Sequence, residues 1–391
     1  MANKSPNPAA PMIDRASKGQ VVLVLQGGGA LGAYQGGVFQ ALSEAGTEPD
    51  WVVGTSIGAI NGAIIAGNAP AERLGKLREF WRRVAHSGPT ALLGAVPFIG
   101  TQFANTMTML TGVQNFFAPR PQAFFADTLV GMGMRSGLTA QTAGYYSTAQ
   151  LEATLTDLID LDLLASGKTR LTVGAANVRT AEMRYFDSRR EPVGIKHVMA
   201  SGALPPAFPA VEIDGELFWD GGIISNTPVE AVLDDNPRQN GVVFAVHMWR
   251  PSGPDPDTMN RVMARQKDLQ YASRAVSHIA RQKQIHKLRH VVSELVRNMP
   301  AAVRDSDAGR ELASYGCDSC VHVVRLVSPP LAGEDHTKDI DFSAAGIRSR
   351  WEAGYADTAR VLEQRPWDVV SGPLDGFILH ETEAGDVIKH Y

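Results

Sequence analysis

The feature that most constrains the fold of this chain is a run of small and apolar residues, VVGTSIGAINGAIIAG, at residues 52–67. Two apolar residues lead into a G-x-S-x-G pentapeptide centred on Ser56, and a small-residue run with helical character follows. This order is typical of a nucleophile elbow, a sharp strand-to-helix turn that lifts a serine clear of the backbone. Gly54 and Gly58 suit such a turn because a side chain at either position would collide with neighbouring backbone. The sequence therefore predicts Ser56 as a nucleophile, with a plain structural turn as the alternative.

A second glycine-rich turn precedes the first. The apolar run at 21–25 predicts a strand buried on both faces, and it leads into QGGGALGAY at 26–34. This loop also matches the G-x-G-x-x-G pattern of dinucleotide sites, but such a site needs an acidic residue at the end of the second strand, and Asp50 precedes that strand. We expect an oxyanion hole facing Ser56 rather than a nucleotide site or a purely structural loop.

A serine nucleophile needs a base, and two arrangements are open. Asp220 lies in a glycine-glycine bend at the end of a hairpin whose turn is Asp214-Gly215. A Ser–Asp–His order would add His247, which ends a predicted strand without any glycine turn around it. In a Ser–Asp dyad the carboxylate itself takes the proton. A solvated aspartate with a pKa near 4 is a weak base, and removal of water would raise its basicity.

The segment 91–134 differs from its surroundings because Arg120 and Asp127 are its only charged residues, while it is rich in Phe and Met. Its first part, residues 91–113, is long enough to span a bilayer, but the proline, glycine and amide residues there argue against a membrane span. The open alternatives are a buried insertion and a lid or acyl-entry surface that touches lipid, because Met and Phe adapt to irregular apolar partners.

Composition sets limits on the class of protein. The chain has 391 residues and a net charge of −4, which gives no global attraction to nucleic acid. Cys317 and Cys320 form a lone C-x-x-C, which predicts core or loop cysteines rather than a zinc site or a redox pair. Residues 1–19 lack the apolar core of a signal peptide and are expected to form a disordered leader. A cytoplasmic enzyme without metal or cofactor is the expectation.

The last third of the chain is predicted to form a separate region. A Pro/Asp/Gly-rich stretch at 251–257 suits a linker, and residues 259–299 are helical in pattern and basic. We expect a helix or two packed on the main domain with a solvated basic face; contact with anionic lipid or a partner helix is the alternative. A strand is predicted at 321–327 and a final helix from Ser343 to about Glu363. The predicted division is therefore a catalytic domain at 20–250 and a mainly helical extension at 251–391.

Four blocks, taken together in this order, resemble the patatin-like phospholipase family. They are GGGALG at 27–32, GTSIG at 54–58, AS at 200–201 with LPPAFP at 204–209, and DGG at 220–222. The resemblance implies a three-layer α/β/α fold with a mostly parallel central sheet, and the region after 250 resembles a helical extension found in a bacterial branch. It also implies a Ser56–Asp220 dyad, an oxyanion hole from the backbone N–H groups of Gly27, Gly28 and Gly29, and lipid acyl hydrolase activity that needs no metal.

One departure concerns the substrate. Many family members carry Arg or Lys in the glycine loop, where this chain has Ala30-Leu31, so the case for a phospholipid over a neutral ester or thioester is weaker. The leading hypothesis is a serine lipid acyl hydrolase of the phospholipase A, lysophospholipase or carboxylesterase type. The alternatives are a non-catalytic lipid or acyl-chain binding protein and an acyltransferase or thioesterase that uses the same site.

Further expectations follow from these hypotheses. The partner would be a lipid or acyl-ester substrate, with peripheral membrane contact and no nucleic acid, and the oligomeric state is open. The residues expected to line the substrate site are Ile57, Phe116, Phe117, Pro205 and Pro206.

Overall fold

The computed structural model describes residues 13–85, 108, 110–123, 138–331, 334–369, 372, 374–383 and 386–390. Most of the predicted apolar insertion, including 91–107 and 124–134, lies outside these residues, as does 1–12 of the predicted leader. The leader prediction is wrong for residues 13–19, because Ile13 is buried and Arg15–Lys18 form a short helix, α1. The Arg15 guanidinium is paired with the Asp50 carboxylate, which ties this segment to the start of a central strand.

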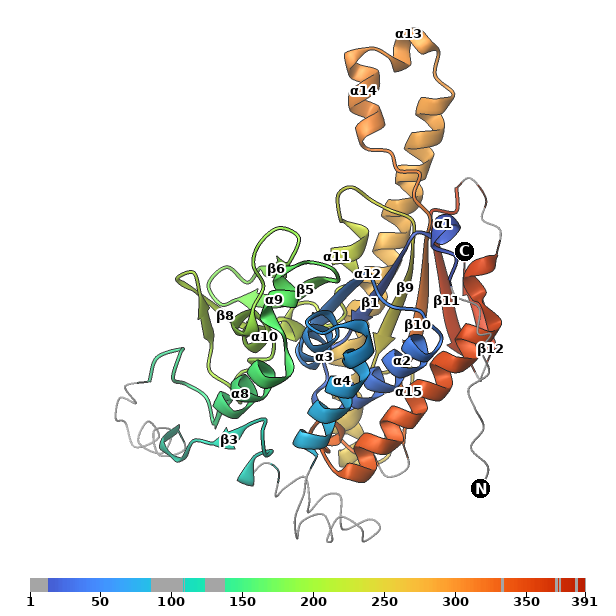
Figure 1. The fold of residues 1–391 in the computed structure, drawn as a ribbon. Helices are drawn as coiled ribbons and strands as arrows, with labels where there is room; N and C mark the ends of the chain where they lie inside the picture. Colours follow the sequence, from blue (N-terminus) through green and yellow to red (C-terminus); the bar gives the residue numbers. More distant parts are fainter. Residues whose placement is uncertain are drawn as a thin grey trace.

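Among the described residues, the core is one ten-stranded sheet in the order β12-β11-β10-β9-β1-β2-β5-β8-β7, with β6 also paired to β5 (Figure 1). The six strands from β11 to β5 are mutually parallel, and antiparallel strands complete both edges. The mostly parallel sheet predicted from the sequence is thus confirmed. The strands are β1 (Gln20–Leu25), β2 (Trp51–Thr55), β5 (Arg170–Asn177), β6 (Met183–Asp187), β7 (Val211–Ile213), β8 (Glu216–Asp220), β9 (Gly241–His247), β10 (Val321–Val327), β11 (Phe377–Glu383) and β12 (Asp386–His390).

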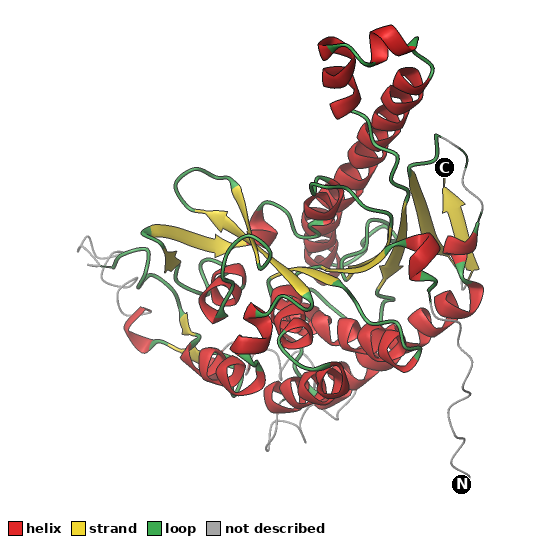
Figure 2. Cartoon of the chain, turned by 45° about the horizontal axis from the view of Figure 1, so that its top comes forward, coloured by secondary structure: helices red, strands yellow, loops and turns green. Residues whose placement is uncertain are grey.

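Helices cover both faces of this sheet, which gives the expected three layers (Figure 2). The central strands are buried on both faces, as their continuous apolar sequences require. One face packs against α2 (Ala33–Glu44), α3 (Ile57–Ala66), α4 (Pro70–Val84) and α15 (Ala344–Gln364). The other packs against α11 (Val229–Leu233) and part of α12 (Met259–Arg297).

Shorter elements complete the described fold. They are α8 (Ala149–Leu158), α9 (Leu161–Ala165), α10 (Ile195–Ser201), the two-stranded ribbon β3 (Ala118–Pro119) and β4 (Tyr146–Ser147), and four 3₁₀ turns, η1 (Gly29–Gly32), η2 (Gly221–Ile223), η3 (Lys338–Ile340) and η4 (Pro366–Asp368).

The C-terminal region is mainly helical, as expected, and it also extends the sheet. β10 has the bounds predicted from the sequence, whereas β11 and β12 were not expected. Helix α15 lies so close to α2 that a Cβ on Gly37 or Gly354 would clash with the backbone of the other helix. The division at residue 250 stays a prediction, because the sheet and the helix packing both continue across it.

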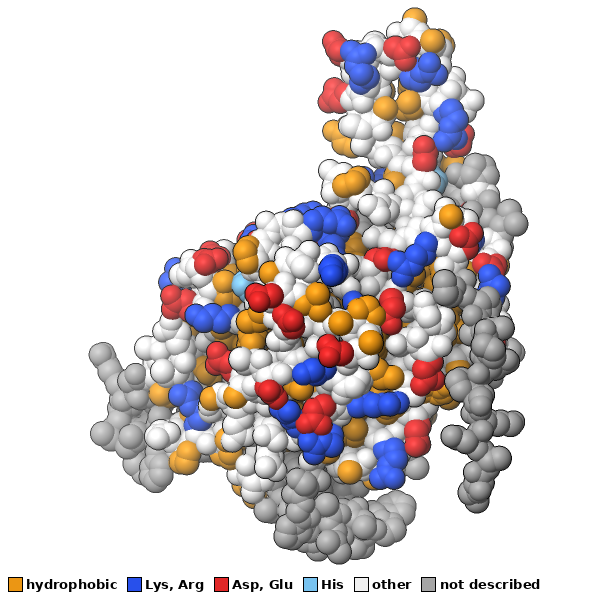
Figure 3. Space-filling model, in the orientation of Figure 1, with side chains coloured by type: hydrophobic (Ala, Val, Ile, Leu, Met, Phe, Trp, Pro, Cys, Tyr) orange, Lys and Arg blue, Asp and Glu red, His pale blue; other side chains and the backbone are white. Residues whose placement is uncertain are grey.

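The far end of α12 projects from the body with α13 (Ala301–Arg304) and α14 (Asp307–Ser314), as an arm (Figure 1). Acidic and basic side chains alternate over its tip in the space-filling view (Figure 3). The apolar residues spaced by seven along α12, Val262, Leu269 and Val276, are exposed, and this helix instead buries Ala272, Ala275 and Ile279. A search of the described helices found none with the length and hydropathy needed to cross a membrane.

Candidate active site

Ser56 stands at the turn between β2 and α3, with a φ of 57° and a ψ of −126°. Non-glycine residues rarely adopt this conformation, and it persists only where the surrounding structure imposes it. The neighbouring glycines explain how. A Cβ on Gly54 would clash with the carbonyl of Gly58, and a Cβ on Gly58 would clash with the carbonyl of Leu25. The strand, turn and helix therefore pack at backbone contact, and Ser56 lies at the cavity described below.

Ser201 links this turn to the adjacent strand β5. The backbone N–H of Ser56 donates to Ser201 Oγ at 2.9 Å, and Ser201 Oγ donates to the carbonyl of Gly174 in β5 at 2.6 Å. Ser201 is fully buried at the end of α10. Sequence reasoning placed this residue in a family block but gave it no role. The only signal was that block, because a lone serine at a helix end has no distinctive pattern.

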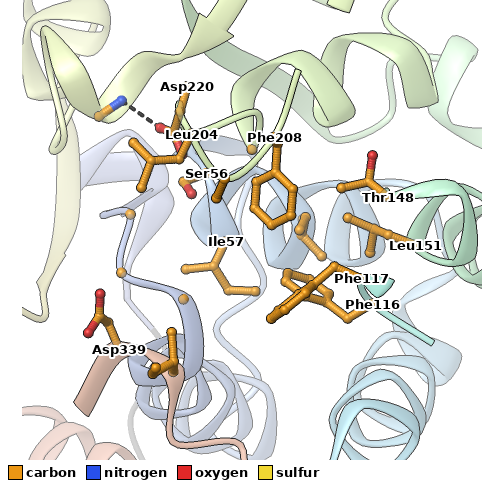
Figure 4. Close-up of a pocket in the computed structure, with 18 of the residues that line it drawn as sticks. Ser56, Ile57, Phe116, Phe117, Thr148, Leu151, Leu204, Phe208, Asp220 and Asp339 are labelled. Carbon is orange, nitrogen blue, oxygen red and sulfur yellow. Dashed lines mark hydrogen bonds between the residues drawn. The ribbon is translucent and has the colours of Figure 1, made fainter. Parts of the chain in front are cut away.

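Asp220 ends β8, where it pairs with Ala175 of β5. Its side chain is buried, and one carboxylate oxygen accepts a hydrogen bond from the Gly222 N–H at 2.7 Å (Figure 4). The Ser56 side chain lies near enough to this carboxylate to lower its pKa. Burial nevertheless raises the pKa of Asp220 to about 6, against the opposing effects of the Ser56 side chain and the Gly222 N–H. The two side chains, 164 positions apart in sequence, thus meet at the carboxyl edge of the sheet.

The glycine loop divides its N–H groups between two uses. The N–H of Gly27 is taken by Asn226, through its side-chain oxygen at 3.1 Å and its carbonyl at 3.2 Å. The carbonyl of Gly27 accepts from Asn226 Nδ2 at 3.1 Å and from Trp249 Nε1 at 2.9 Å. The N–H groups of Gly28 and Gly29 have no hydrogen-bond partner among the described residues. Only these two of the three predicted donors are therefore available to a ligand.

A cavity of about 320 Å³ opens beside Ser56 and Asp220 (Figure 4). Of the predicted lining residues, Ile57, Phe116 and Phe117 border it, but Pro205 and Pro206 do not. Their neighbours on the same loop form the wall instead: Leu204, Ala207 and Phe208. The sequence indicated the rigid loop and not which of its side chains face inward.

The wall opposite this loop is aromatic and comes from distant parts of the chain. Phe116 and Phe117 have ring centroids 5.6 Å apart, Phe117 contacts Phe208 at 5.6 Å, and Phe116 contacts Phe342 at 5.4 Å. Residues 339, 340 and 342 of the C-terminal region also line the cavity, which the sequence did not suggest.

His247 is not part of this site. It is fully buried at the end of β9 and does not border the cavity. Neither ring nitrogen has a hydrogen-bond partner among the described residues, and burial holds the pKa of His247 well below its usual value. The Ser–Asp–His alternative is therefore contradicted, since a catalytic histidine must reach both the serine and the aspartate.

Cys317 and Cys320 are free thiols. Within the described ranges, no three His, Cys, Asp or Glu side chains are grouped so as to hold a metal ion.

Comparison with known proteins places these observations in a family. The model of the patatin-like phospholipase family matches residues 23–233, and a second model, described as patatin phospholipase, matches residues 269–373. The chain is 25% identical over 268 residues to lysophospholipase nte1 of Aspergillus terreus, covering 63% of this chain and 14% of that protein. It is 27% identical over 213 residues to patatin-like phospholipase domain-containing protein 7 of Rattus norvegicus, covering 54% and 12% respectively.

Among solved structures, the chain is similar to VipD from Legionella pneumophila, with a TM-score of 0.38 and 17% identity over 88% of this chain and 67% of that one. The chain spans about one seventh or less of the length of the two curated relatives. The first family model alone covers more than half of the 391 residues. This protein therefore belongs to the patatin-like phospholipase family.

Proposed function

We propose that the protein is a serine acyl hydrolase that cleaves fatty-acyl esters with a Ser56–Asp220 dyad. The observation that carries the proposal is that Ser56 and the buried carboxylate of Asp220 lie side by side at one apolar cavity, near enough for the serine side chain to lower the pKa of the carboxylate. A serine hydroxyl is a weak nucleophile unless a neighbouring base takes its proton during attack. Asp220 is the acceptor within reach. A pKa of about 6 keeps it largely ionised at pH 7 and more basic than a solvated carboxylate.

In the proposed reaction, Ser56 Oγ attacks the acyl carbonyl carbon while its proton passes to Asp220. The negative charge that develops on the carbonyl oxygen is stabilised by the N–H groups of Gly28 and Gly29, which have no other partner among the described residues. The tetrahedral intermediate collapses, and the alcohol leaves with the proton from Asp220. Water then attacks the acyl-enzyme with Asp220 again as the base, releasing the fatty acid and restoring Ser56.

Gly27 has a different role in this scheme. Its N–H and its carbonyl are both bonded to Asn226, and its carbonyl also accepts from Trp249, so we assign it to holding the loop in place. Removal of one oxyanion donor typically lowers kcat by about 10²–10³-fold. A loop that presents two such donors must be held accurately.

The lining favours an acyl chain as the bound group. Its aromatic and aliphatic side chains offer apolar contact and leave Ser56 at the place where an ester group would lie. The relatives carry the names lysophospholipase and patatin-like phospholipase, which makes phospholipid and lysophospholipid the first substrates to examine. Thioester hydrolysis and acyl transfer use the same residues and differ only in leaving group or acceptor. Peripheral membrane contact and a cytoplasmic location stay predictions of the sequence.

The test is hydrolysis of p-nitrophenyl esters, lysophospholipids, diacylphospholipids and acyl-CoA thioesters by the wild type and by Ser56→Ala. Loss of all activity in a folded Ser56→Ala protein is expected. Ser314→Ala, which changes an exposed serine on α14, is the matched control and should behave as wild type. A fluorophosphonate probe should label Ser56 covalently. Absence of labelling in folded wild-type protein would favour the non-catalytic lipid-binding alternative.

A further inference from the structure

A segment more than 300 residues after the glycine loop reaches the same cavity. Asp339 and Ile340 of η3, and Phe342 just beyond it, border the cavity beside Ser56. In the close-up, Asp339 lies across the glycine loop from Asp220 (Figure 4). Gly29 has a φ of +56°, and a Cβ built on it would clash with the carbonyl oxygen of Asp339. The C-terminal segment is therefore in close contact with the backbone of Gly29, one of the proposed oxyanion donors.

Two ion pairs hold this segment on α12. Lys267 Nζ bonds both oxygens of Asp339, at 2.7 and 2.9 Å, and Lys338 Nζ bonds Asp268 at 2.7 Å. The partners are adjacent on each element, so the pairs act as a double clamp. The Lys338 side chain is 8% exposed and that of Asp268 is 14% exposed. The Lys267–Asp339 pair is more exposed, at 34% and 22%, and its two hydrogen bonds to one carboxylate fix its geometry. Fully solvent-exposed pairs contribute little.

Lys338 of the double clamp also contacts Trp249, which bonds to Gly27 at the start of the glycine loop. The Lys338 ammonium lies 5.1 Å from the centroid of the Trp249 ring, and Trp249 donates to the Gly27 carbonyl at 2.9 Å. Tyr271 of α12 packs on Trp249 with centroids 4.8 Å apart. Gly27 and Gly29 are thus each restrained by elements that follow β9, and Gly28 lies between them. The loop has few hydrogen bonds of its own at Gly28 and Gly29, so these outside contacts set where their N–H groups point.

We propose that the η3 segment and its double clamp on α12 position the oxyanion loop. Asp339 is a positioning residue, and Phe342 forms part of the aromatic wall that would contact the acyl chain. The inference rests on the proposed function and adds that the C-terminal region is required for efficient chemistry. An oxyanion donor stabilises the transition state only when it is aimed at the developing charge, and a displacement of about 1 Å can cost on the order of 10²-fold in rate. The acyl pocket binds substrate in the ground state as well, so loosening the loop should lower kcat more than it raises KM.

The experiment weakens the clamp without touching the dyad. Lys267→Met and Asp339→Asn should each lower kcat by about tenfold with KM changed by less than threefold. The reciprocal variant, Lys267→Asp with Asp339→Lys, should recover most of the loss. The matched control is Arg261→Met, because Arg261 of the same helix forms an exposed ion pair with Asp257, which lies just before the helix, and does not border the cavity. The control should keep wild-type kcat.

A second readout does not depend on catalysis. Hydrogen exchange of the peptide covering residues 26–33 should be faster in Lys267→Met and Asp339→Asn, and unchanged in Arg261→Met. Wild-type kcat and wild-type exchange in both clamp variants would overturn the inference, and so would lower thermal stability with unchanged kcat and unchanged loop exchange. Should the wild type hydrolyse no ester, the proposed function fails, and the exchange measurement still decides whether the clamp orders the loop.

Discussion

The two ends of strand β5 contrast two ways of burying a carboxylate. At the amino end, Asp187 and Asp235 are buried against Arg170, whose guanidinium donates to each of them at 2.9 Å. Near the carboxyl end, Asp220 pairs with Ala175 and is equally buried, but no cation bonds to it among the described residues. Burial alone would raise the pKa of all three. Arg170 holds the pKa of Asp187 and that of Asp235 below their usual values, whereas the pKa of Asp220 is raised to about 6.

Under the proposed function, this difference separates two structural acids from a reactive one. A carboxylate paired with an arginine is stabilised as the anion and loses its basicity, so Asp187 and Asp235 hold β5, β6 and the segment after α11 together. Asp220 has only a serine side chain and a backbone N–H to lower its pKa, so its negative charge is poorly stabilised in this buried site. That cost is what makes it a base, and it is the pattern expected where function takes precedence over stability.

The largest expected effect is on activity. Asp220→Asn should lower kcat/KM by about 10²–10⁴-fold, because an amide cannot accept the serine proton. Asp187→Asn should leave the specific activity of the folded protein within a few-fold of wild type. His247→Asn should also keep most of the activity, since that side chain does not border the cavity. Ester hydrolysis with purified, folded variants is the measurement; equal losses in Asp220→Asn and Asp187→Asn would erase the contrast.

The next effect is on stability at the amino end. Arg170→Met leaves two buried carboxylates without their cation and should lower the free energy of unfolding by about 3–5 kcal/mol. The control is Arg190→Met in the same cluster, whose side chain is 63% exposed and whose ion pair contributes about 1 kcal/mol or less. Urea unfolding followed by circular dichroism gives both numbers. Similar losses for the two variants would show that burial of the pair is unimportant.

The pH dependence should have opposite signs at the two ends. Because the folded state raises the pKa of Asp220 from 3.8 to about 6, the folded protein binds an extra proton between these values. Stability therefore falls as pH rises through this window, by roughly 3 kcal/mol in total. Asp187 and Asp235 contribute stability that is present above their unfolded pKa and is lost as pH falls through their lowered folded values.

Two measurements separate these terms. kcat/KM should rise as pH increases through about 6 and then level off, as Asp220 ionises. Asp220→Asn should raise the thermal midpoint at pH 7–8, because it removes a buried charge, whereas Asp187→Asn should lower it. A lower midpoint for Asp220→Asn at neutral pH would contradict the assignment of an unpaired, strained charge to this position.

The sequence could single out the residues of the proposed dyad because their signals are local. Ser56 and Asp220 each lie in short glycine-bounded patterns that depend on backbone geometry, and the run of apolar strands indicated a mostly parallel sheet. The role of Gly27 was only partly predictable. The pattern indicated a loop rich in free N–H groups, but which group would be satisfied by Asn226 depends on a side chain 199 positions away.

The remaining features of the site could not be predicted because they too depend on contacts between segments that are distant in sequence. Asp339 and Phe342 lie in TKDIDF, a stretch with no motif, and they are held at the cavity by contacts with distant elements, the ion pairs to α12 and the close packing of α15 on α2. On α12, Val262 and Leu269 have the spacing of a buried stripe, yet both are exposed, since the helix presents small residues to the body. A sequence pattern indicates which residues can share one face of a helix or strand, but it does not indicate which other element that face will contact.

The smallest expected effect tests the middle of β5, where the two regions join. Ser201→Ala removes the hydroxyl that links the Ser56 N–H to the Gly174 carbonyl, and it should cost about 1–3 kcal/mol because it leaves a buried donor unpaired. Ser188→Ala is the matched control at the amino end, where Ser188 Oγ accepts from the Leu171 N–H at 2.9 Å. Both should lower the urea midpoint, but only Ser201→Ala should also lower kcat, by up to about tenfold, because only its hydroxyl holds the turn that carries Ser56. Unchanged kcat in Ser201→Ala would mean that the glycine contacts of the turn are enough to hold Ser56. Strand β5 would then affect the proposed active site only through its pairing with Asp220.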